Sequence, residues 1–453
     1  MSNSIITFRF WFLVCVVFCF CKQGFSQEGF SLPDHKKRDA ISFKIVNNLV
    51  VIPVEVNGTR LSFLLDTGVD NTIIFSLTRN DSIELNNTRS VKLRGLGAGE
   101  TITALRSENN TITIGDAIDK NHTIYFIFDQ SLNLSTRMGV PIHGIIGYDF
   151  FKNFVVKTNY VSERLVFYDA DSYRKKPCRR CEVFDLTFNK NKPYLDLKLD
   201  KKDSLAQELH LLLDSGSSDA LWLFDEPAIT EDLSKNSFED FLGLGLSGNI
   251  FGKRSRIGEV SLGSFKLLGV NVAFPEHEAI ASAKLYKDRD GSVGGDFLKR
   301  FVSIIDYKRR KIILRKGRNF SDPFTYNMSG LTLEHEGMNT IRREKNSKTE
   351  IQFSNSNLDT KSYASSEVSA YRVFEVVLVP RFVVAEVRTN SLAEKLGIVR
   401  GSELLEVNGK AAHTYKLYEL NDLFSSKPGK KISLLVAYDG FQRKIQMVLE
   451  KVL

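Results

Sequence analysis

Residues 64–75 read LLDTGVDNTIIF, and residues 212–224 read LLDSGSSDALWLF. In both stretches an Asp, a small hydroxyl residue and a Gly stand in the same order between two apolar runs that are typical of buried strands. A single Asp-Thr-Gly sequence is an ordinary turn. Its repetition 148 residues later, inside matching apolar frames, indicates a duplicated structural unit with one Asp turn in each copy.

Other landmarks repeat in the same order. GIIGYDFFKNFVV at 144–156 corresponds to GSVGGDFLKRFVS at 291–303, and the Gly-rich GLGAGE at 95–100 corresponds to GLGLSGN at 243–249. Between residues 42 and 317, short apolar or alternating runs are separated by Gly, Asn and Asp, and helical periodicity is scarce. The sequence therefore predicts a mainly β, bilobal fold, with an N-lobe over 42–170 and a C-lobe over 182–317.

Paired carboxylates explain why each lobe would keep its Asp turn. When a fold brings two carboxylates to about 3 Å, like charges cannot both ionise at neutral pH, and the pair keeps one proton. Such a pair contains an acid and a base, and it can activate a water molecule that attacks an amide carbonyl. Asp66 and Asp214 are therefore the predicted catalytic residues.

The residues that follow each Asp have a predicted supporting role. Gly68 and Gly216 allow a tight backbone turn whose N–H groups approach the carboxylates. Thr67 and Ser215 carry short hydroxyls that can form hydrogen bonds across to the partner loop. We therefore expect the two turns to be locked together.

The chain from about 42 to 317 resembles the pepsin-like and retropepsin-like aspartic proteases, which pair a D-T/S-G turn in each half with a later apolar-apolar-Gly segment. Residues that match this second element are Ile146 and Gly147 in the first half and, less closely, Val293 and Gly294 in the second. The resemblance implies an Asp66–Asp214 dyad, an extended peptide in the cleft and no cofactor.

Two positions after the Asp turns differ from each other. Ser217 retains a hydroxyl that the resemblance implies as support for the second aspartate, whereas Val69 stands at the matching place in the first half. We therefore expect inequivalent carboxylates, with the charge held better by Asp214 and the proton carried more often by Asp66. GLGAGE and GLGLSGN are the candidate flap regions. The seven histidines do not cluster at metal-ligand spacing, so no metal site is predicted.

Residues 320–453 have a different character and predict a small α+β module. The pattern SLAEKLGIVRGSELLEVNGK at 391–410, with MSGLTL before it, resembles a PDZ domain. PDZ domains bind a C-terminal peptide tail as an added strand and bind its carboxylate with backbone N–H groups. The resemblance implies a carboxylate-binding loop with Ser329 and Gly330, and an accepting strand that starts at Leu331. A polar stretch at about 339–369 is predicted to be a solvated insertion or loop.

The N-terminus predicts export. Arg9 precedes the apolar run FWFLVCVVFCFC, which is too short to cross a bilayer comfortably and is followed by small residues, so residues 1–26 read as a cleaved signal peptide. A lipid anchor on Cys21 is the weaker alternative, because Phe20 before it is not small. The predicted location is secreted or periplasmic, and the combination of domains resembles that of exported bacterial proteases.

Cys178 and Cys181 remain after the predicted cleavage, in a lone C-x-x-C sequence. Neither further zinc ligands nor a thioredoxin-type context accompanies them, so a small surface disulfide is predicted, with free thiols as the alternative. The 62 basic and 54 acidic residues are spread along the chain, so a nucleic-acid partner is not expected. The expected partners are peptides or unfolded proteins. A peptide-binding protein that has kept the cleft but lost catalysis is the alternative to a protease.

Overall fold

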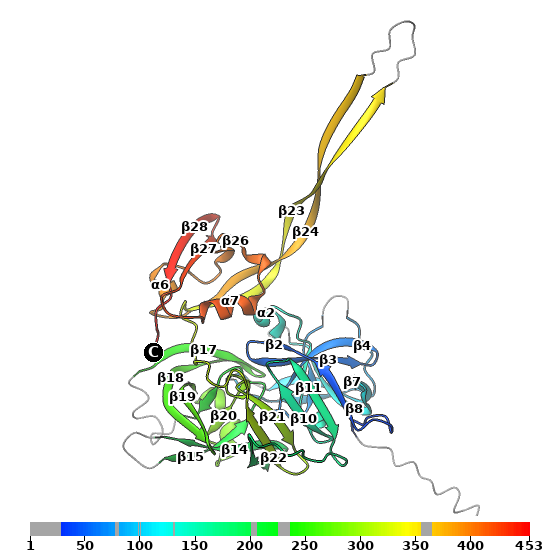
Figure 1. Ribbon diagram of the computed structural model, residues 1–453, viewed down its shortest axis with the longest axis vertical. Coiled ribbons are helices and arrows are strands. Elements are labelled where there is room, and N and C mark those ends of the chain that lie inside the picture. The colour runs from blue at the N-terminus through cyan, green and yellow to red at the C-terminus, as the bar shows by residue number, and fades with distance from the viewer. Residues whose placement is uncertain are drawn as a thin grey trace, which may run out of the picture.

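The computed structural model describes residues 29–77, 81–97, 99, 101–129, 132–200, 206–224, 236–354 and 365–453, without the side chains of 345–354 and 365–372. The predicted signal peptide and Cys21 lie outside the described residues. Figure 1 shows two β-rich lobes side by side, a smaller domain against them, and a long hairpin that projects from that domain. No helix in the described part of the chain has both the length and the hydropathy needed to cross a membrane.

The N-lobe is built on an eight-stranded sheet. Its strands lie in the order β2 (Lys44–Val46), β3 (Leu49–Val56), β4 (Thr59–Leu65), β9 (Gly144–Ile146), β5 (Thr72–Ile74), β8 (Ala117–Ile127), β7 (Ile102–Ile114) and β6 (Arg89–Leu93). Short helices α2 (Leu134–Met138) and α3 (Tyr148–Phe151) precede and follow β9. The lobe also begins earlier than residue 42, because the buried Phe30 packs on Phe150 and Ser31 pairs with Ile118.

The C-lobe repeats this sheet strand for strand. Its order is β13 (Thr187–Asn189), β14 (Lys192–Leu199), β15 (Gln207–Leu213), β20 (Gly291–Val293), β16 (Leu221–Leu223), β19 (Phe265–Pro275), β18 (Gly248–Leu262) and β17 (Phe238–Gly245). Helix α5 (Gly295–Leu298) follows β20 as α3 follows β9, and two 3-10 turns, η2 (Glu278–Ile280) and η3 (Ala283–Leu285), lie between β19 and β20. The topology therefore has the duplication that the repeated landmarks predict.

A third sheet joins the lobes and receives three strands from each. Its order is β1 (Arg38–Ser42), β11 (Arg164–Asp169), β10 (Phe154–Asn159), β21 (Phe301–Asp306), β22 (Lys311–Lys316) and β12 (Cys181–Asp185). β10 and β21 pair antiparallel across the boundary between the lobes. Because one hydrophobic core runs through both lobes, their Asp turns are held in a fixed relation. A disulfide joins Cys178 and Cys181 just before β12.

The C-terminal domain has its own hydrophobic core. Its sheet runs β23 (Leu331–Ser354), β24 (Ser365–Val387), β25 (Glu403–Val407), β27 (Lys431–Tyr438) and β28 (Phe441–Val448), and β26 (Lys410–Ala411) pairs with β25. Three short helical segments complete it: α6 (Leu392–Lys395), η4 (Ala412–Thr414) and α7 (Leu417–Phe424). The side chain of Ser391 caps α6 by accepting a hydrogen bond from the Glu394 N–H.

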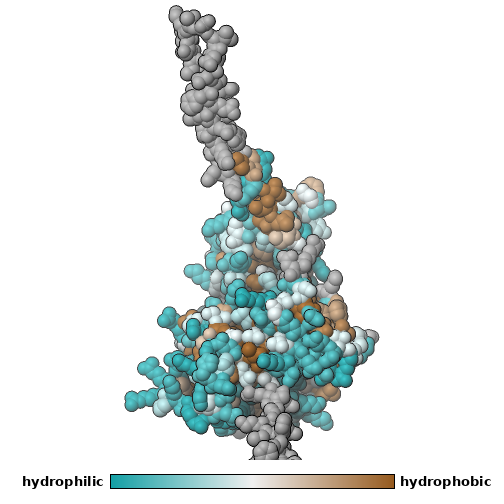
Figure 2. Space-filling model, turned by 90° about the vertical axis from the view of Figure 1, so that its right-hand side faces the viewer, coloured by the Kyte–Doolittle hydropathy of each residue, from teal (hydrophilic) through white to brown (hydrophobic). Residues whose placement is uncertain are grey.

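The prediction of a solvated loop at 339–369 is wrong for most of that stretch. β23 and β24 continue through it as an antiparallel hairpin, whose register runs from Leu331↔Val387 to Ser354↔Ser365. The register shifts at three places along the hairpin, between Thr332 and Leu333, His335 and Met338, and Glu344 and Ser347. A two-stranded ladder satisfies the backbone groups of both strands without a buried face. Figure 2 shows hydrophobic side chains on the part of the hairpin next to the body; Val376 and Leu378 are exposed there.

Candidate active site

Each Asp turn begins where a buried strand ends beside a parallel neighbour. β4 pairs parallel with β9, and the Asp66 N–H donates to the Ile146 carbonyl at 2.9 Å. In the C-lobe, β15 pairs parallel with β20, and the Asp214 N–H donates to the Val293 carbonyl at 2.9 Å. The apolar-apolar-Gly segments thus lie directly beside the turns and fix where each aspartate leaves its strand.

The glycines that end those segments are required by close packing. An ideal Cβ on Gly147 would lie 2.1 Å from the Asp66 carbonyl oxygen, and one on Gly294 would lie 2.4 Å from that of Asp219. Heavy atoms cannot approach so closely, so both positions demand Gly.

Reciprocal hydrogen bonds lock the two turns together. The Thr67 hydroxyl donates to the Leu213 carbonyl at 2.6 Å, and the Ser215 hydroxyl donates to the Leu65 carbonyl at 2.8 Å. Each hydroxyl oxygen also accepts a bond from the backbone N–H of the other residue, at 3.0 Å in both directions. All four groups are buried, so the site is rigid across the lobe boundary.

The two carboxylates occupy one small space. An ideal Cβ on Gly68 would lie 3.2 Å from Oδ1 of Asp66 and 3.2 Å from Oδ1 of Asp214. Burial and the negative charge of Asp214 raise the pKa of Asp66 to about 7, although the Gly68 N–H donates to its Oδ1 at 2.7 Å. The raised pKa therefore favours retention of one proton by the pair up to about neutral pH.

The surroundings of the two aspartates differ. Burial also raises the pKa of Asp214. The positive charge of Lys192 and the backbone N–H of Gly216 oppose the rise in pKa at both aspartates, whereas the positive charge of Arg289 and the backbone N–H of Ser217 oppose it at Asp214. Ser217 thus supports Asp214 through its backbone. The positive charge of Arg289 favours ionisation of Asp214, whereas the negative charge of Asp214 raises the pKa of Asp66. The proton on Asp66 and the charge on Asp214 stay a prediction.

Some supporting residues have no signal in the sequence. The buried Tyr307 donates its hydroxyl to the Thr67 carbonyl at 3.1 Å and stacks on Phe151 with ring centroids 5.2 Å apart. Arg289 is also buried and donates to the Gly291 carbonyl and the Ser292 hydroxyl. These side chains come from segments that only the fold brings to the dyad.

The two Gly-rich loops meet each other above the dyad. The Ser247 N–H donates to the Leu96 carbonyl at 2.8 Å, and the Gly99 N–H donates to the Ser247 carbonyl at 2.8 Å. The Gly95 N–H also donates to the Ser247 hydroxyl at 3.2 Å. One loop from each lobe therefore contributes to a cover over the cavity that Asp66 and Asp214 also line.

A cavity of about 910 Å³ lies under this cover. Its lining includes Asp66, Asp214, Val69 and Ser217 from the Asp turns, both Gly-rich loops, and residues of the C-terminal domain. The volume is in the range of pockets that bind ligands. The dyad is thus accessible from a cleft that three parts of the chain enclose.

The predicted carboxylate-binding loop is already engaged within the chain. The N–H groups of Ser329 and Gly330 donate to Oδ1 of Asn327 at 3.0 and 3.1 Å, and the Leu331 N–H donates to the Ser329 hydroxyl at 3.1 Å. The expectation that these N–H groups are free for a peptide carboxylate is therefore wrong, because the Asn327 amide oxygen accepts two of them. The accepting strand β23 is an edge strand of its sheet and lines the cavity from Leu331 to Leu333. Helix α2 of the N-lobe packs beside it, and Arg137 pairs with Glu334.

Metal ligands do not gather at this site. Within the described ranges, no group of three His, Cys, Asp or Glu side chains is placed to hold an ion.

Residues 52–150 match the family described as aspartyl protease, and residues 383–437 match that of the PDZ domain. These two parts of the chain are therefore similar to an aspartyl protease domain and to a PDZ domain. The aspartyl protease match contains Asp66 and the Ile146-Gly147 segment but ends before the C-lobe, whose equivalence rests on its strand order. Together the two domains support a protease with an added peptide-binding domain.

The solved structures similar to this chain include an aspartic proteinase from Irpex lacteus, at 13% identity and a TM-score of 0.40. The alignment covers 62% of this chain and 98% of that chain. Nothing about activity is built on so distant a likeness. No curated protein matches the sequence.

Proposed function

We propose that this protein is an aspartic endopeptidase that hydrolyses peptide bonds with a water molecule held between Asp66 and Asp214. The observation that carries the proposal is the shared burial of these two carboxylates against Gly68, with the pKa of Asp66 raised to about 7. A singly protonated pair supplies an acid and a base at the same place.

The proposed chemistry assigns one task to each aspartate. Asp214, whose charge Arg289 and Lys192 stabilise, removes a proton from the water as its oxygen attacks the scissile carbonyl carbon. Asp66 donates its proton to the carbonyl oxygen, which gives a neutral tetrahedral diol. In the second step the diol returns that proton to Asp66, and Asp214 transfers its proton to the leaving nitrogen. The C–N bond then breaks and the amine is released.

The substrate is proposed to be an extended peptide or unfolded protein. The cleft has the covering loops of both lobes above it and the edge strand β23 at its side. An extended chain can satisfy its backbone groups against such an edge. The PDZ domain then contributes to substrate binding.

Cleavage of a mixed peptide library by the wild type, Asp66→Asn and Asp214→Asn between pH 3 and pH 8 tests the proposal. We expect cleavage by the wild type and a loss of at least about 10³-fold in each variant, because each lacks one of the two proton-transfer groups. If the wild type binds peptides yet cleaves none, the protein is a non-catalytic peptide-binding protein. Unfolding curves of the three proteins control for misfolding.

We also propose export through a signal peptide at 1–26 to the periplasm or the cell exterior, in a bacterium. The apolar run before Cys21 and the Cys178–Cys181 disulfide support an oxidising compartment. N-terminal sequencing of the mature protein from its native host tests this, with Gln27 as the expected first residue.

A further inference from the structure

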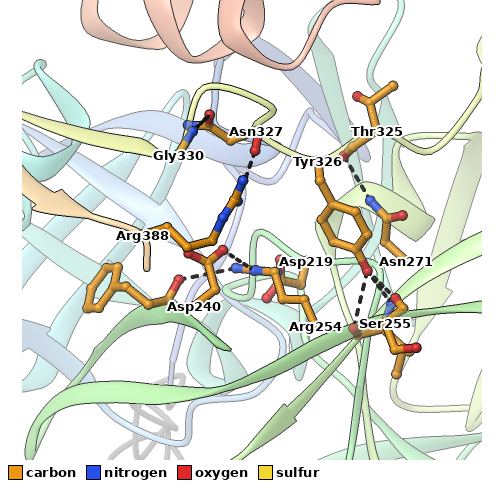
Figure 3. A network of polar contacts seen from close by, with 12 residues as sticks. Asp219, Asp240, Arg254, Ser255, Asn271, Thr325, Tyr326, Asn327, Gly330 and Arg388 are labelled. Atoms are coloured by element: carbon orange, nitrogen blue, oxygen red, sulfur yellow. Dashed lines mark hydrogen bonds and ion pairs between the residues drawn. The ribbon is translucent and has the colours of Figure 1, made fainter. Parts of the chain in front are cut away.

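The PDZ domain is fixed to the C-lobe by the segment that leads into it. The Asn271 side chain donates to the Thr325 carbonyl at 2.8 Å, and the buried Tyr326 hydroxyl donates to the Ser255 carbonyl and accepts a bond from the Val272 N–H (Figure 3). The residues before Ser329 are therefore part of the C-lobe surface and leave little freedom for a swinging domain.

The same domain also packs on the N-lobe through α7. The Asn421 side chain donates to Oδ1 of Asn47 at 3.2 Å, and Gly139 lies so near Leu417 that an ideal Cβ would be 2.4 Å from the Leu417 Cβ. Figure 1 shows α7 next to α2 of the N-lobe. The peptide groove between β23 and α7 consequently faces the protease lobes.

Groove and catalytic cleft form one cavity. Gly330, Leu331 and Asn421 line the same space as Asp66 and Asp214. A peptide that lies along the edge of β23 would therefore continue into the cleft. The PDZ domain is in this way a wall of the cleft.

The charge of this cavity is strongly positive. Five of its basic residues have no ion pair in the described part of the chain: Arg94, Lys190, Lys192, Arg289 and Arg388. Opposite them stand Asp70 and the single charge of the dyad. An excess of cations in a shared cavity attracts an anionic chain.

Arg388 is the cation that the PDZ domain contributes. It follows β24, and its Nη1 donates to the Asn327 carbonyl at 2.9 Å (Figure 3). Its guanidinium lies 4.4 Å from the centroid of the Phe238 ring. The acidic neighbour Asp240 is already paired with Arg254, Oδ2 to Nε at 2.7 Å, and Asp219 pairs with the same Arg254. Arg388 is held in position and keeps N–H donors for a ligand, because one of its five is used here.

We infer that Arg388 binds a carboxylate of the substrate at the PDZ wall of the cleft, so that the protease selects acidic peptides. The inference rests on the proposed function. Asn327 accepts the N–H groups of the loop, so the guanidinium takes over the anion contact that those groups would otherwise make. The carboxylate can be a Glu or Asp side chain or a free C-terminus, and both have the same fork-shaped match to Arg.

Four versions of one peptide that the wild type cleaves test the inference: Glu or Gln at the positions on each side of the scissile bond, each with a free acid or an amide C-terminus. We expect a kcat/KM at least about tenfold higher for the carboxylate-bearing versions, mostly through KM. Arg388→Gln removes that preference, and Arg388→Lys keeps part of it. Comparison of Glu with Gln tests a side-chain carboxylate, and comparison of the free acid with the amide tests a C-terminal carboxylate.

A purely structural role for Arg388 would lower kcat/KM equally for all four peptides, and that result would overturn the inference. So would a wild type that prefers none of them. Arg400→Gln is the matched control, because Arg400 lies in the same domain, is largely exposed and does not line the cavity. If the wild type cleaves nothing, the proposed function fails. Fluorescence anisotropy of the labelled peptides then still shows whether binding prefers the acid and depends on Arg388.

Discussion

Gly216 of the C-lobe lies directly against the Asp66 carboxylate of the N-lobe: an ideal Cβ on Gly216 would be 2.1 Å from Oδ2 and 2.3 Å from Cγ. Asp66 itself is buried, and its Oδ1 accepts a hydrogen bond from the Gly68 N–H. The small size of Gly216 in one lobe therefore determines where the Asp66 carboxylate of the other lobe can lie.

Gly216→Ala is expected to displace Asp66 and to lower kcat by about 10²-fold, the usual cost of a misplacement of about 1 Å. Gly68→Ala is the matched comparison, because its ideal Cβ would meet the same carboxylates at 3.2 Å and requires a smaller shift. Steady-state cleavage of one peptide by both variants measures whether Gly216→Ala loses more kcat than Gly68→Ala. Equal losses would contradict the geometry.

Thr67→Val is expected to lower the free energy of unfolding by roughly 1–3 kcal/mol, because the Ser215 N–H and the Leu213 carbonyl each lose a buried partner. Thr67→Ser keeps the hydroxyl and should retain most of the stability and activity. Denaturant unfolding followed by fluorescence measures the difference. A Val variant as stable as the wild type would show that the crossed hydroxyls contribute little.

The pH dependence of stability follows from the raised pKa of Asp66, from 3.8 to about 7. Between these values the folded state binds more protons than the unfolded state, so the free energy of unfolding falls as pH rises, by up to about 1.4 kcal/mol per pH unit. The penalty is complete above the folded pKa. Asp66→Asn should flatten this slope, as measured by denaturant unfolding at pH 4, 5.5 and 7.

The same titration limits activity. Cleavage needs the proton on the dyad, so we expect kcat to fall as pH rises through about 7, with an apparent pKa that belongs to the pair. A wild-type activity that keeps rising beyond pH 8 would contradict the proposed roles. A pH profile of kcat at saturating peptide provides the measurement.

Gly139→Ala is expected to loosen the contact between the PDZ domain and the N-lobe. Gly139 has φ +66° and its added Cβ would be 2.4 Å from the Leu417 Cβ. Gly440→Ala is the control, because Gly440 has φ +79° with nothing within 4 Å, so it bears only the backbone cost of roughly 1–2 kcal/mol. Domain-resolved hydrogen exchange should show faster exchange in α7 for Gly139→Ala alone.

The long hairpin shows where composition misleads. The stretch at 339–369 is polar and predicts a solvated insertion or loop, yet β23 and β24 pair along its described residues, 339–354 and 365–369. The hydropathy of a segment indicates whether it is buried, but not whether its backbone is paired. In a two-stranded ladder the backbone N–H and C=O groups form hydrogen bonds with each other. In the predicted carboxylate-binding loop, the Asn327 amide oxygen accepts the N–H groups of Ser329 and Gly330, a contact that the sequence pattern does not indicate.

The sequence by itself predicted the duplicated β fold and singled out Asp66 and Asp214 as the candidate pair. It could do so from the repeated Asp-hydroxyl-Gly turns and apolar-apolar-Gly segments, because strand periodicity and Gly requirements are local properties of the chain. Tertiary structure alone decided the contacts of Arg289 and Tyr307 with the Asp turns, the meeting of the two Gly-rich loops, and the PDZ domain as a wall of the cleft. These features join segments far apart in sequence. Their distances and charges are set by how two lobes and a third domain pack, which no local pattern records.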